Sequence, residues 1–184
     1  MKFKRLRFLL LLILLVFVVL QIFHRPSYLM GRIFGTSNII VIDPGHGGHD
    51  PGTIGINNSY EKDINLDISK KLYEKLKSMD YEVILTRKID EAVDNIDRAK
   101  LANRKRARIF ISVHCNALEN NNHTNGIQVL YYPGRKGIFN DSDNETLAHM
   151  ILEQVLISTG AENMGIVERE DLIVLNQTKM PAII

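Results

Sequence analysis

Short apolar blocks alternate along this chain with longer stretches in which apolar residues recur every three or four positions. Blocks bounded by Pro, Gly, Asn or Asp predict buried strands, and the longer stretches predict amphipathic helices. The predicted strands are Ile39–Asp43, Glu82–Thr86, Ile109–His114, Gly126–Tyr132 and Leu172–Leu175, with Pro181–Ile184 opening a sixth. The predicted helices are Tyr60–Met79, Ile96–Arg106 and Ser142–Ser158.

This alternation predicts an α/β fold with a mostly parallel central sheet of about six strands and helices on both faces. One face of the first helix is apolar and is expected to pack on the sheet; it comprises Ile64, Ile68, Leu72, Leu76 and Met79. In the second helix, Arg98 belongs to a basic cluster that we interpret as a solvated face. Attraction of this cluster to an anionic polymer is the alternative.

The first 36 residues differ in composition from the rest. Four basic residues precede the apolar run Phe8–Leu20, which predicts a signal peptide or membrane anchor over residues 1–25, followed by a tether over 26–36. The positive-inside rule then places the domain, residues 37–184, on the extracytoplasmic side of the membrane.

Charge and cysteine content argue against two classes of protein, nucleic-acid-binding proteins and disulfide-stabilised proteins. Residues 1–36 hold six of the 23 Lys and Arg and none of the 21 Asp and Glu, so the domain carries 23 − 6 = 17 basic against 21 acidic residues. This balance does not favour a nucleic-acid partner. Cys115 is the single cysteine, which excludes an intrachain disulfide.

The segment Ile39–Gly52, I-I-V-I-D-P-G-H-G-G-H-D-P-G, delivers His46 on a glycine-rich loop after a buried strand. No G-K-[ST] follows, so the phosphate-binding interpretation fails and a metal or catalytic site remains. His114 ends another predicted strand, and the carboxyl ends of parallel strands share one edge of the sheet. The two histidines are therefore expected to meet.

Glu61 admits two interpretations. With Asn58 as N-cap it would complete a capping box, which is a purely structural role. Alternatively, its carboxylate in the first helical turn lies near the loop that carries His46. Two imidazoles and one carboxylate at one edge of a sheet are the ligand set of an open zinc site, although spacing alone does not establish this one.

Several motifs along the chain carry a resemblance to a known family. They are V-I-D-P-G-H-G-G-H-D-P-G at 41–52, E-K-D at 61–63, R-x-x-x-A-N at 98–103, I-F-I-S-V-H-C-N-A at 109–117 and G-I-x-V-x-Y-Y at 126–132, followed by the segment 165–175, which ends in L-x-V-L. In this order they resemble the zinc-dependent N-acetylmuramoyl-L-alanine amidases often called amidase type 3, of the sporulation and germination kind.

The resemblance implies that His46, Glu61 and His114 bind Zn²⁺ and that the substrate is the amide between N-acetylmuramic acid and L-alanine in peptidoglycan. It thus favours the ligand role of Glu61. Asp43 is expected to orient a ligand histidine, and Asn116 to support the site or contact substrate. Expected partners are peptidoglycan and, through residues 1–25, the membrane, and a protein activator stays open.

One departure from the family pattern concerns catalysis. In relatives the last strand leads into a glutamate that acts as general base, and this residue would lie beyond Ile184. The sequence is therefore expected to be an incomplete catalytic domain, its last strand and helix cut short. A truncated, non-catalytic zinc-binding protein of the cell wall is the alternative to an enzyme.

We expect the 184-residue chain to release stem peptides from purified peptidoglycan far more slowly than a version extended through the missing strand, glutamate and helix. Removing a general base typically lowers the rate by about 10² to 10⁴-fold. The measurement is peptide release by both proteins at equal concentration. Comparable turnover would mean that another carboxylate serves as the base.

Overall fold

A computed structural model describes residues 37–55, 57–117, 124–134 and 142–184. The leader and tether expected over 1–36 lie outside the described residues, so both stay predictions. Within the described part of the chain, none of the helices has the length and apolar content that a membrane span requires. The residues Asn38–Ile184 form one compact unit.

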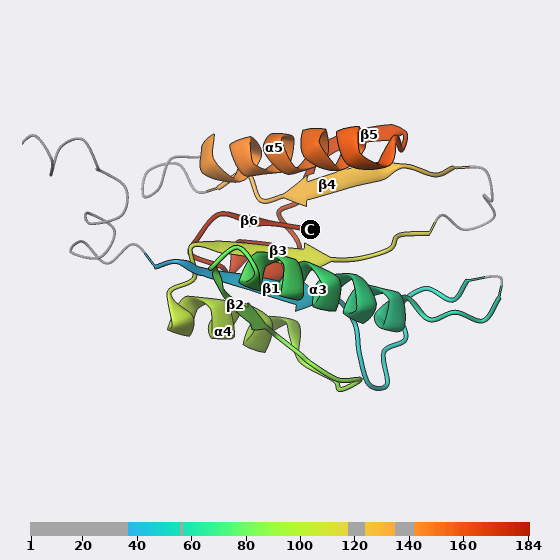
Figure 1. Ribbon diagram of the computed structural model, residues 1–184, viewed down its shortest axis with the longest axis horizontal. Helices are drawn as coiled ribbons and strands as arrows, with labels where there is room; N and C mark the ends of the chain where they lie inside the picture. The colour runs from blue at the N-terminus through green and yellow to red at the C-terminus, as the bar shows by residue number, and fades with distance from the viewer. Residues whose placement is uncertain (1–36, 56, 118–123, 135–141) are drawn as a thin grey trace, which may run out of the picture. The chain divides into compact units, whose positions relative to one another are not determined.

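This unit alternates strands and helices as the sequence pattern predicts (Figure 1). The elements are β1 (Ile39–Pro44), α3 (Glu61–Lys77), β2 (Glu82–Leu85), α4 (Asn95–Lys105), β3 (Ile109–Val113), β4 (Ile127–Tyr131), α5 (Ser142–Thr159), β5 (Asn163–Glu168), α6 (Ile173–Asn176) and β6 (Ala182–Ile183).

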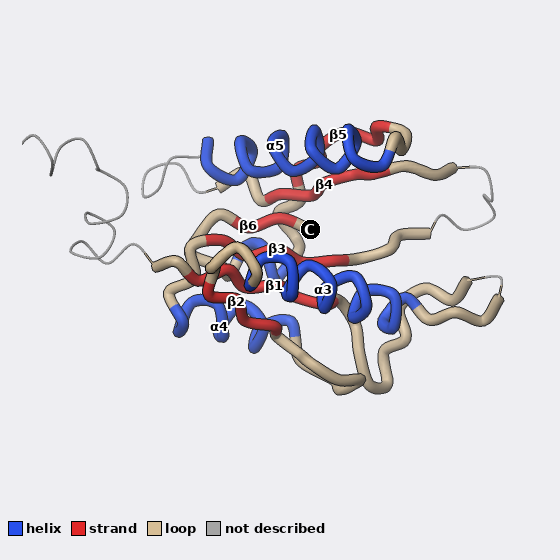
Figure 2. Tube along the Cα trace, viewed as in Figure 1, coloured by secondary structure: helices blue, strands red, loops and turns tan. Residues whose placement is uncertain are grey.

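The strands form one six-stranded sheet in the order β2-β1-β3-β6-β4-β5 (Figure 2). All neighbouring pairs are parallel except β4 and β6, which are antiparallel. The predicted α/β class with a mostly parallel sheet is confirmed. Because β1 and β3 are adjacent and parallel, with Pro44 beside Val113, the residues that follow them emerge together at one edge of the sheet.

Helices cover both faces of the sheet, and the strand alternation explains how. Ile40 and Ile42 of β1 belong to the core cluster packed against α3, whereas Val41 belongs to the cluster that includes α4 and α6 residues. On the α3 side, α5 packs over β4 through Ala148 and Leu152. Every β1 side chain from Ile40 onward is buried, so this strand forms a rigid base for the loop that follows it.

The fifth strand was wrongly placed by the sequence pattern. Leu172–Leu175 is not a strand: α6 begins at Ile173, and Val174 and Leu175 pack into the core beside α4. A short apolar run cannot be distinguished from a buried helical turn by periodicity alone. The fifth strand is instead β5, whose sequence N-M-G-I-V-E contains Gly165 at a positive φ and lacks a continuous apolar run.

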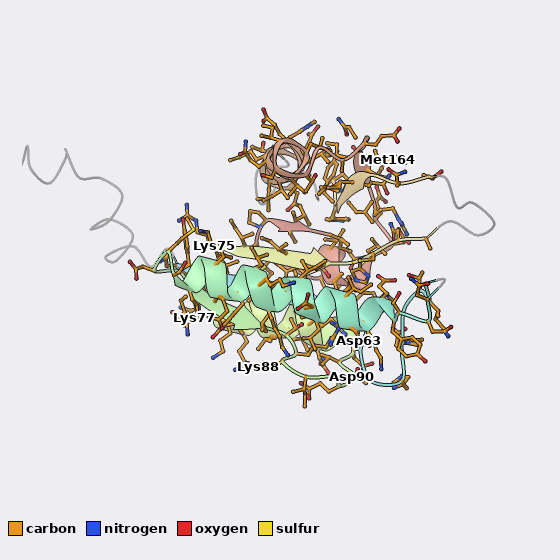
Figure 3. The ribbon with its side chains drawn as sticks, turned by 45° about the vertical axis from the view of Figure 1, so that its right-hand side comes forward. Asp63, Lys75, Lys77, Lys88, Asp90 and Met164 are labelled. Carbon is orange, nitrogen blue, oxygen red and sulfur yellow. The ribbon has the colours of Figure 1, made fainter. Side chains whose placement is uncertain are left out.

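The buried face of α3 differs in part from the predicted one, although Leu72 and Leu76 pack against the core as predicted. Ile64, Ile68 and Met79 are exposed, while Glu61, Asn65, Leu66 and Ser69 are buried. Glu61, Asn65 and Ser69 are four residues apart, so turning Glu61 inward brings the other two inward as well. Figure 3 shows Asp63 near the start of this helix and Lys75 and Lys77 near its end, charges that complement the helix dipole.

Leu152→Ala tests the packing of α5 on the sheet. Leu152 is 5% exposed and lies in a cluster with Val129, Tyr131, Ala148 and Ile183. The truncation should lower the free energy of unfolding by about 2–5 kcal/mol. Urea unfolding of the variant and the parent measures the change. A loss below about 1 kcal/mol would mean that α5 is not packed as described.

Candidate metal centre

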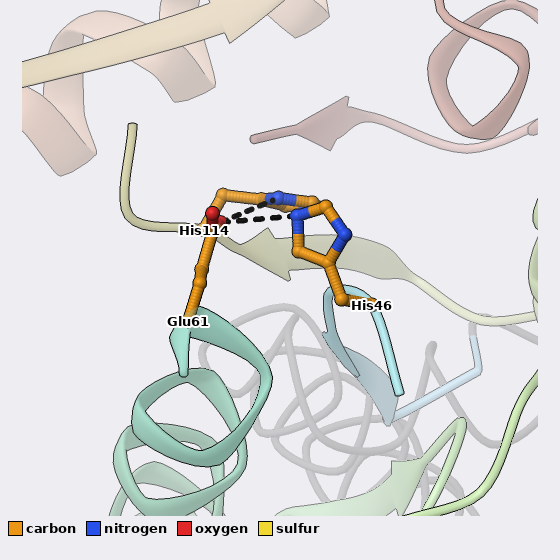
Figure 4. Close-up of side chains that lie close together, drawn as sticks. All are labelled: His46, Glu61 and His114. Carbon is orange, nitrogen blue, oxygen red and sulfur yellow. Dashed lines mark hydrogen bonds and ion pairs between the residues drawn. The ribbon is translucent and has the colours of Figure 1, made fainter. Parts of the chain in front are cut away.

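His46, Glu61 and His114 come together at the edge of the sheet where β1 and β3 end (Figure 4). One ligand atom from each lies within 4.8 Å of the others. His46 follows β1, His114 follows β3, and Glu61 is the first residue of α3. The two imidazole rings meet edge to face with centroids 4.7 Å apart. The predicted meeting of the two histidines is confirmed.

Glu61 is 3% exposed, and its carboxylate is surrounded by hydrogen-bonding groups. Oε1 lies 3.1 Å from Nδ1 of His114 and 3.2 Å from Nε2 of His46, and it accepts a 2.8 Å bond from the Cys115 amide. Oε2 accepts bonds from the Thr53 amide at 2.9 Å and the Thr53 hydroxyl at 2.8 Å. Burial opposes ionisation, but the bonds from His114, Thr53 and Cys115 outweigh it and hold the pKa of Glu61 well below its usual range.

The capping box predicted at Asn58 is wrong. The residue before α3 is Tyr60, which makes no side-chain capping bond, and Glu61 is the first helical residue rather than the third. Asn58 has a φ of 56° and lies in the preceding turn. The Glu61 carboxylate therefore faces the histidines instead of the backbone at the helix start.

The side chain that orients His46 is Asp50, which the sequence analysis did not single out. Asp50 Oδ2 lies 2.8 Å from Nδ1 of His46. A carboxylate accepts hydrogen bonds, so Asp50 can hold a proton on Nδ1 and leave Nε2, which lies 3.2 Å from Glu61 Oε1, as the nitrogen that a metal ion would take. An Asp four residues after a loop histidine was the available signal, although loop geometry had to bring them together.

Among the residues that the structure describes, Asp43 makes no hydrogen bond or ion pair to a histidine, so a direct orienting role finds no support in its contacts. Its carboxylate accepts hydrogen bonds from Thr86, from Ser112 at 2.7 Å and from Arg98 at 2.7 Å. Both Asp43 and Arg98 are almost completely buried, at 1% and 3% exposure. The residue does influence the His46 loop, but through Arg98 rather than directly.

Arg98 is not part of a solvated basic face, contrary to prediction. It donates to the carbonyls of Pro44 at 2.7 Å, His46 at 2.8 Å and Val93 at 2.9 Å, besides its bond to Asp43. It shares the buried face of α4 with Ala99 and Ala102. Its position one turn before Ala102 was the signal that could have placed it inward.

Arg87 is a second buried arginine, and sequence reasoning missed it. It is 1% exposed and donates to the carbonyls of Pro44, Gly45, Lys62 and Ile89. Burial lowers its pKa, and the positive charge of Arg98 adds to this effect. An arginine whose partners are backbone carbonyls leaves no pattern in the sequence, because carbonyl groups occur at every residue.

Two glycines allow the three side chains to approach one another. A Cβ on Gly45 would lie 2.2 Å from Nε2 of His114. At Gly52, whose φ is +65°, a Cβ would lie 2.7 Å from the His46 ring and 2.8 Å from Glu61 Cβ. Any other residue at these positions would displace a histidine or Glu61.

The histidines line an open cleft together with Asp50 and Asn116. Asn116 is exposed beside His114, where the sequence analysis expected it to support the site or contact substrate. Cys115 is half-buried, and its backbone amide, not its thiol, bonds to Glu61. Burial raises the pKa of the Cys115 thiol, and the nearby Glu61 charge adds to this effect.

The chemistry of the donor set suits a metal ion. Two imidazoles and one carboxylate are common ligands of zinc in sites that retain an open position. Within the described residues, His46, Glu61 and His114 are the group of His, Cys, Asp and Glu side chains arranged in this way.

The depressed pKa of Glu61 predicts a pH-dependent stability of the metal-free protein. Since the folded-state pKa lies below the ordinary 4.5, Glu61 stabilises the fold above that pH and loses this contribution as the pH falls below it. Glu61→Gln should therefore lower the free energy of unfolding by about 1–3 kcal/mol at about pH 7, where an amide cannot accept every bond that the carboxylate accepts.

Urea unfolding of metal-free parent and Glu61→Gln at about pH 7 and about pH 3.5 measures this difference, which should shrink at the lower pH. Glu74→Gln, at an exposed position of the same helix, is the matched control and should change little at either pH. An equal difference at both pH values would contradict a low pKa for Glu61.

Comparison with known proteins agrees with this geometry. Residues 40–184 match the family model described as N-acetylmuramoyl-L-alanine amidase. The germination-specific N-acetylmuramoyl-L-alanine amidase of Bacillus subtilis is 31% identical over 169 residues, which cover 84% of this chain and 68% of the relative.

Solved structures show the same fold. The N-acetylmuramoyl-L-alanine amidase of Clostridium difficile 630 superposes with a TM-score of 0.74 at 37% identity, covering 80% of this chain and 77% of that one. The CwlD amidase of Clostridioides difficile, solved in complex with the GerS lipoprotein, gives a TM-score of 0.64 at 28% identity, with 79% of each chain covered.

Other curated relatives are longer, and the chain spans 28% of the length of one and 53% of another. The family model nevertheless covers every element of the sheet from Ile40 onward, including the segments that carry His46, Glu61 and His114. The chain therefore belongs to the N-acetylmuramoyl-L-alanine amidase family.

Proposed function

We propose that this protein is a zinc-dependent peptidoglycan amidase that cleaves the bond between N-acetylmuramic acid and L-alanine. The observation that carries the proposal is the convergence of His46, Glu61 and His114 within 4.8 Å in a chain of this family. The same three residues would hold the Zn²⁺, with His46 and His114 as neutral imidazoles and Glu61 as a carboxylate.

The side chains around this set favour metal binding over a purely structural role. Asp50 holds the proton on Nδ1 of His46 and so keeps Nε2 available as a ligand. Besides the bond to His114, the Thr53 and Cys115 amides donate to Glu61, so the carboxylate has backbone donors that do not depend on the histidines. Zinc bound at such a site lowers the pKa of water toward about 7 and polarises a carbonyl group.

Substrate would enter through the cleft that both histidines line. Asn116 is exposed there and offers an amide group that can donate to a carbonyl or accept from an N–H of the peptide. Asp43 takes no part in substrate contact because it is 1% exposed and committed to Arg98, Thr86 and Ser112. Its contribution is to the position of the His46 loop.

The general base stays a proposal that rests on the family resemblance. In the parallel register of β3 and β6, Ile111 lies beside Ile183. A strand continuing β6 would reach the level of His114 after about three more residues, since parallel partners advance together. A glutamate in such a continuation would thus emerge beside the proposed metal ligands, where a proton must pass from water to the leaving nitrogen.

The site of action follows from the substrate. We propose that the protein acts on peptidoglycan outside the cytoplasm, held to the membrane through residues 1–25, in cell-wall turnover linked to sporulation or germination. The germination-specific relative supports this role. A protein activator is among the proposed partners, since the CwlD amidase was solved with a lipoprotein.

His114→Ala tests the metal assignment. A version of the chain starting at Ser37 should bind about one zinc ion, and the variant should lose most of this metal because a three-ligand protein site cannot spare a ligand. Elemental analysis after dialysis measures the content. The activity of a form that contains the general base should fall by at least about 10²-fold, measured as stem-peptide release.

His149→Ala is the matched control, because His149 lies at an exposed position of α5 outside the three-residue cluster. This variant should keep both zinc and activity. Unchanged metal content in His114→Ala would show that the site is misassigned, and equal losses in both variants would indicate a general effect of histidine removal.

A further inference from the structure

The loop that carries His46 has an unusual backbone conformation. His46 has a φ of 61°, in the left-handed region that residues other than glycine rarely adopt. Such conformations persist where surrounding groups fix the backbone more firmly than local preference does. The flanking Gly45, Gly47 and Gly48 add freedom rather than restraint.

Restraint comes from two buried guanidinium groups. Three consecutive carbonyls, those of Pro44, Gly45 and His46, each accept a hydrogen bond from Arg87 or Arg98. The Pro44 carbonyl accepts from Arg87 Nε at 2.9 Å and from Arg98 Nη1 at 2.7 Å. The Gly45 carbonyl accepts from Arg87 at 2.9 Å, and the His46 carbonyl from Arg98 at 2.8 Å.

Arg87 also joins two of the segments that carry the proposed ligands. Its Nη2 donates both to the Gly45 carbonyl and, at 2.7 Å, to the carbonyl of Lys62, the residue after Glu61. One nitrogen thus spans the His46 loop and the first turn of α3. All the hydrogen bonds found for Arg87 among the described residues go to backbone carbonyls.

Arg98 is itself fixed by Asp43, which Thr86 and Ser112 hold in turn. We propose that Arg87 and Arg98 are positioning residues for the metal centre: by holding the carbonyls of Pro44, Gly45 and His46, they set the distance between His46 and Glu61 and hence the metal affinity. The inference rests on the proposed metal site, but neither arginine supplies a ligand.

Lysine variants test this inference at constant charge. Lysine has three donors on one nitrogen, whereas the guanidinium fork reaches carbonyls in different directions. Arg87→Lys and Arg98→Lys should therefore weaken zinc binding by about 10–100-fold, the usual effect of losing groups that orient ligands. Competition with a chromophoric zinc chelator measures the affinity of the folded proteins.

A stability control separates positioning from general destabilisation. Leu152→Ala lowers stability in a core cluster that does not include the site. The zinc affinity of this variant should therefore stay within about threefold of the parent's, a much smaller change than losing ligand-orienting groups causes.

Arg87→Met removes both the positive charge and the hydrogen-bond donors of the guanidinium group. If the main effect of Arg87 were repulsion between its positive charge and the zinc ion, zinc would bind Arg87→Met more tightly than the parent. That result would overturn the proposal.

A measurement without metal keeps this inference separate from the proposed function. The Gly47 amide bonds to the Asp50 carbonyl at 3.0 Å within the His46 loop. In metal-free protein its hydrogen exchange should be faster in either lysine variant than in the parent, relative to the exchange of the core amide of Val41.

Absence of zinc binding by the parent would refute the metal site, while the exchange data would still decide whether the arginines restrain the loop. Should one lysine variant fail to fold, the other provides the same test. Parent-like affinity and parent-like Gly47 exchange in a folded lysine variant would overturn the role proposed for that arginine.

Discussion

Glu61 places a carboxylate where only 3% of its surface reaches solvent, and a buried charge must find hydrogen-bond donors. Its donors come from separate parts of the chain: Thr53 in the loop before α3, Cys115 after β3, and Asn65 one turn along the same helix. Satisfying one carboxylate thus fixes the rotation of α3 and the distance between that helix and β3. The exposure of Ile64 and Ile68 is a consequence of this rotation.

The sheet was largely predictable because its signals are local. β1, β2, β3 and β4 are short apolar blocks, and a chain that alternates them with helices leaves few arrangements for a parallel sheet. The same reasoning brought His46 and His114 to one edge. It failed for α6 and β5, where a four-residue apolar run folds as a helical turn and a strand contains glycine and polar residues.

The parts of the site that could not be predicted depend on contacts between distant residues. Asp50 was missed because only the folded loop brings it to His46. The contacts of Asp43 were not predicted because its partners, Arg98 and Ser112, lie 55 and 69 positions further on. Helical periodicity favours an exposed arginine in a basic stretch. A buried carboxylate reverses that preference here because hydrogen bonds add to the ion pair: Asp43 accepts from Thr86 and Ser112, and Arg98 donates to three backbone carbonyls. Together these bonds offset the cost of removing both charges from water.

The ion pair between Asp43 and Arg98 explains how a glycine-rich loop can hold His46 in a fixed position. Glycine permits the close approach of His114 over Gly45, but the conformational freedom that permits this would also let His46 move. Two guanidinium groups remove that freedom by occupying the loop carbonyls, and Asp43 holds one of them in place. The motifs V-I-D-P-G-H and R-x-x-x-A-N, more than fifty residues apart in the sequence, therefore act as one unit. The first supplies the histidine and the aspartate, and the second supplies the arginine that the aspartate orients.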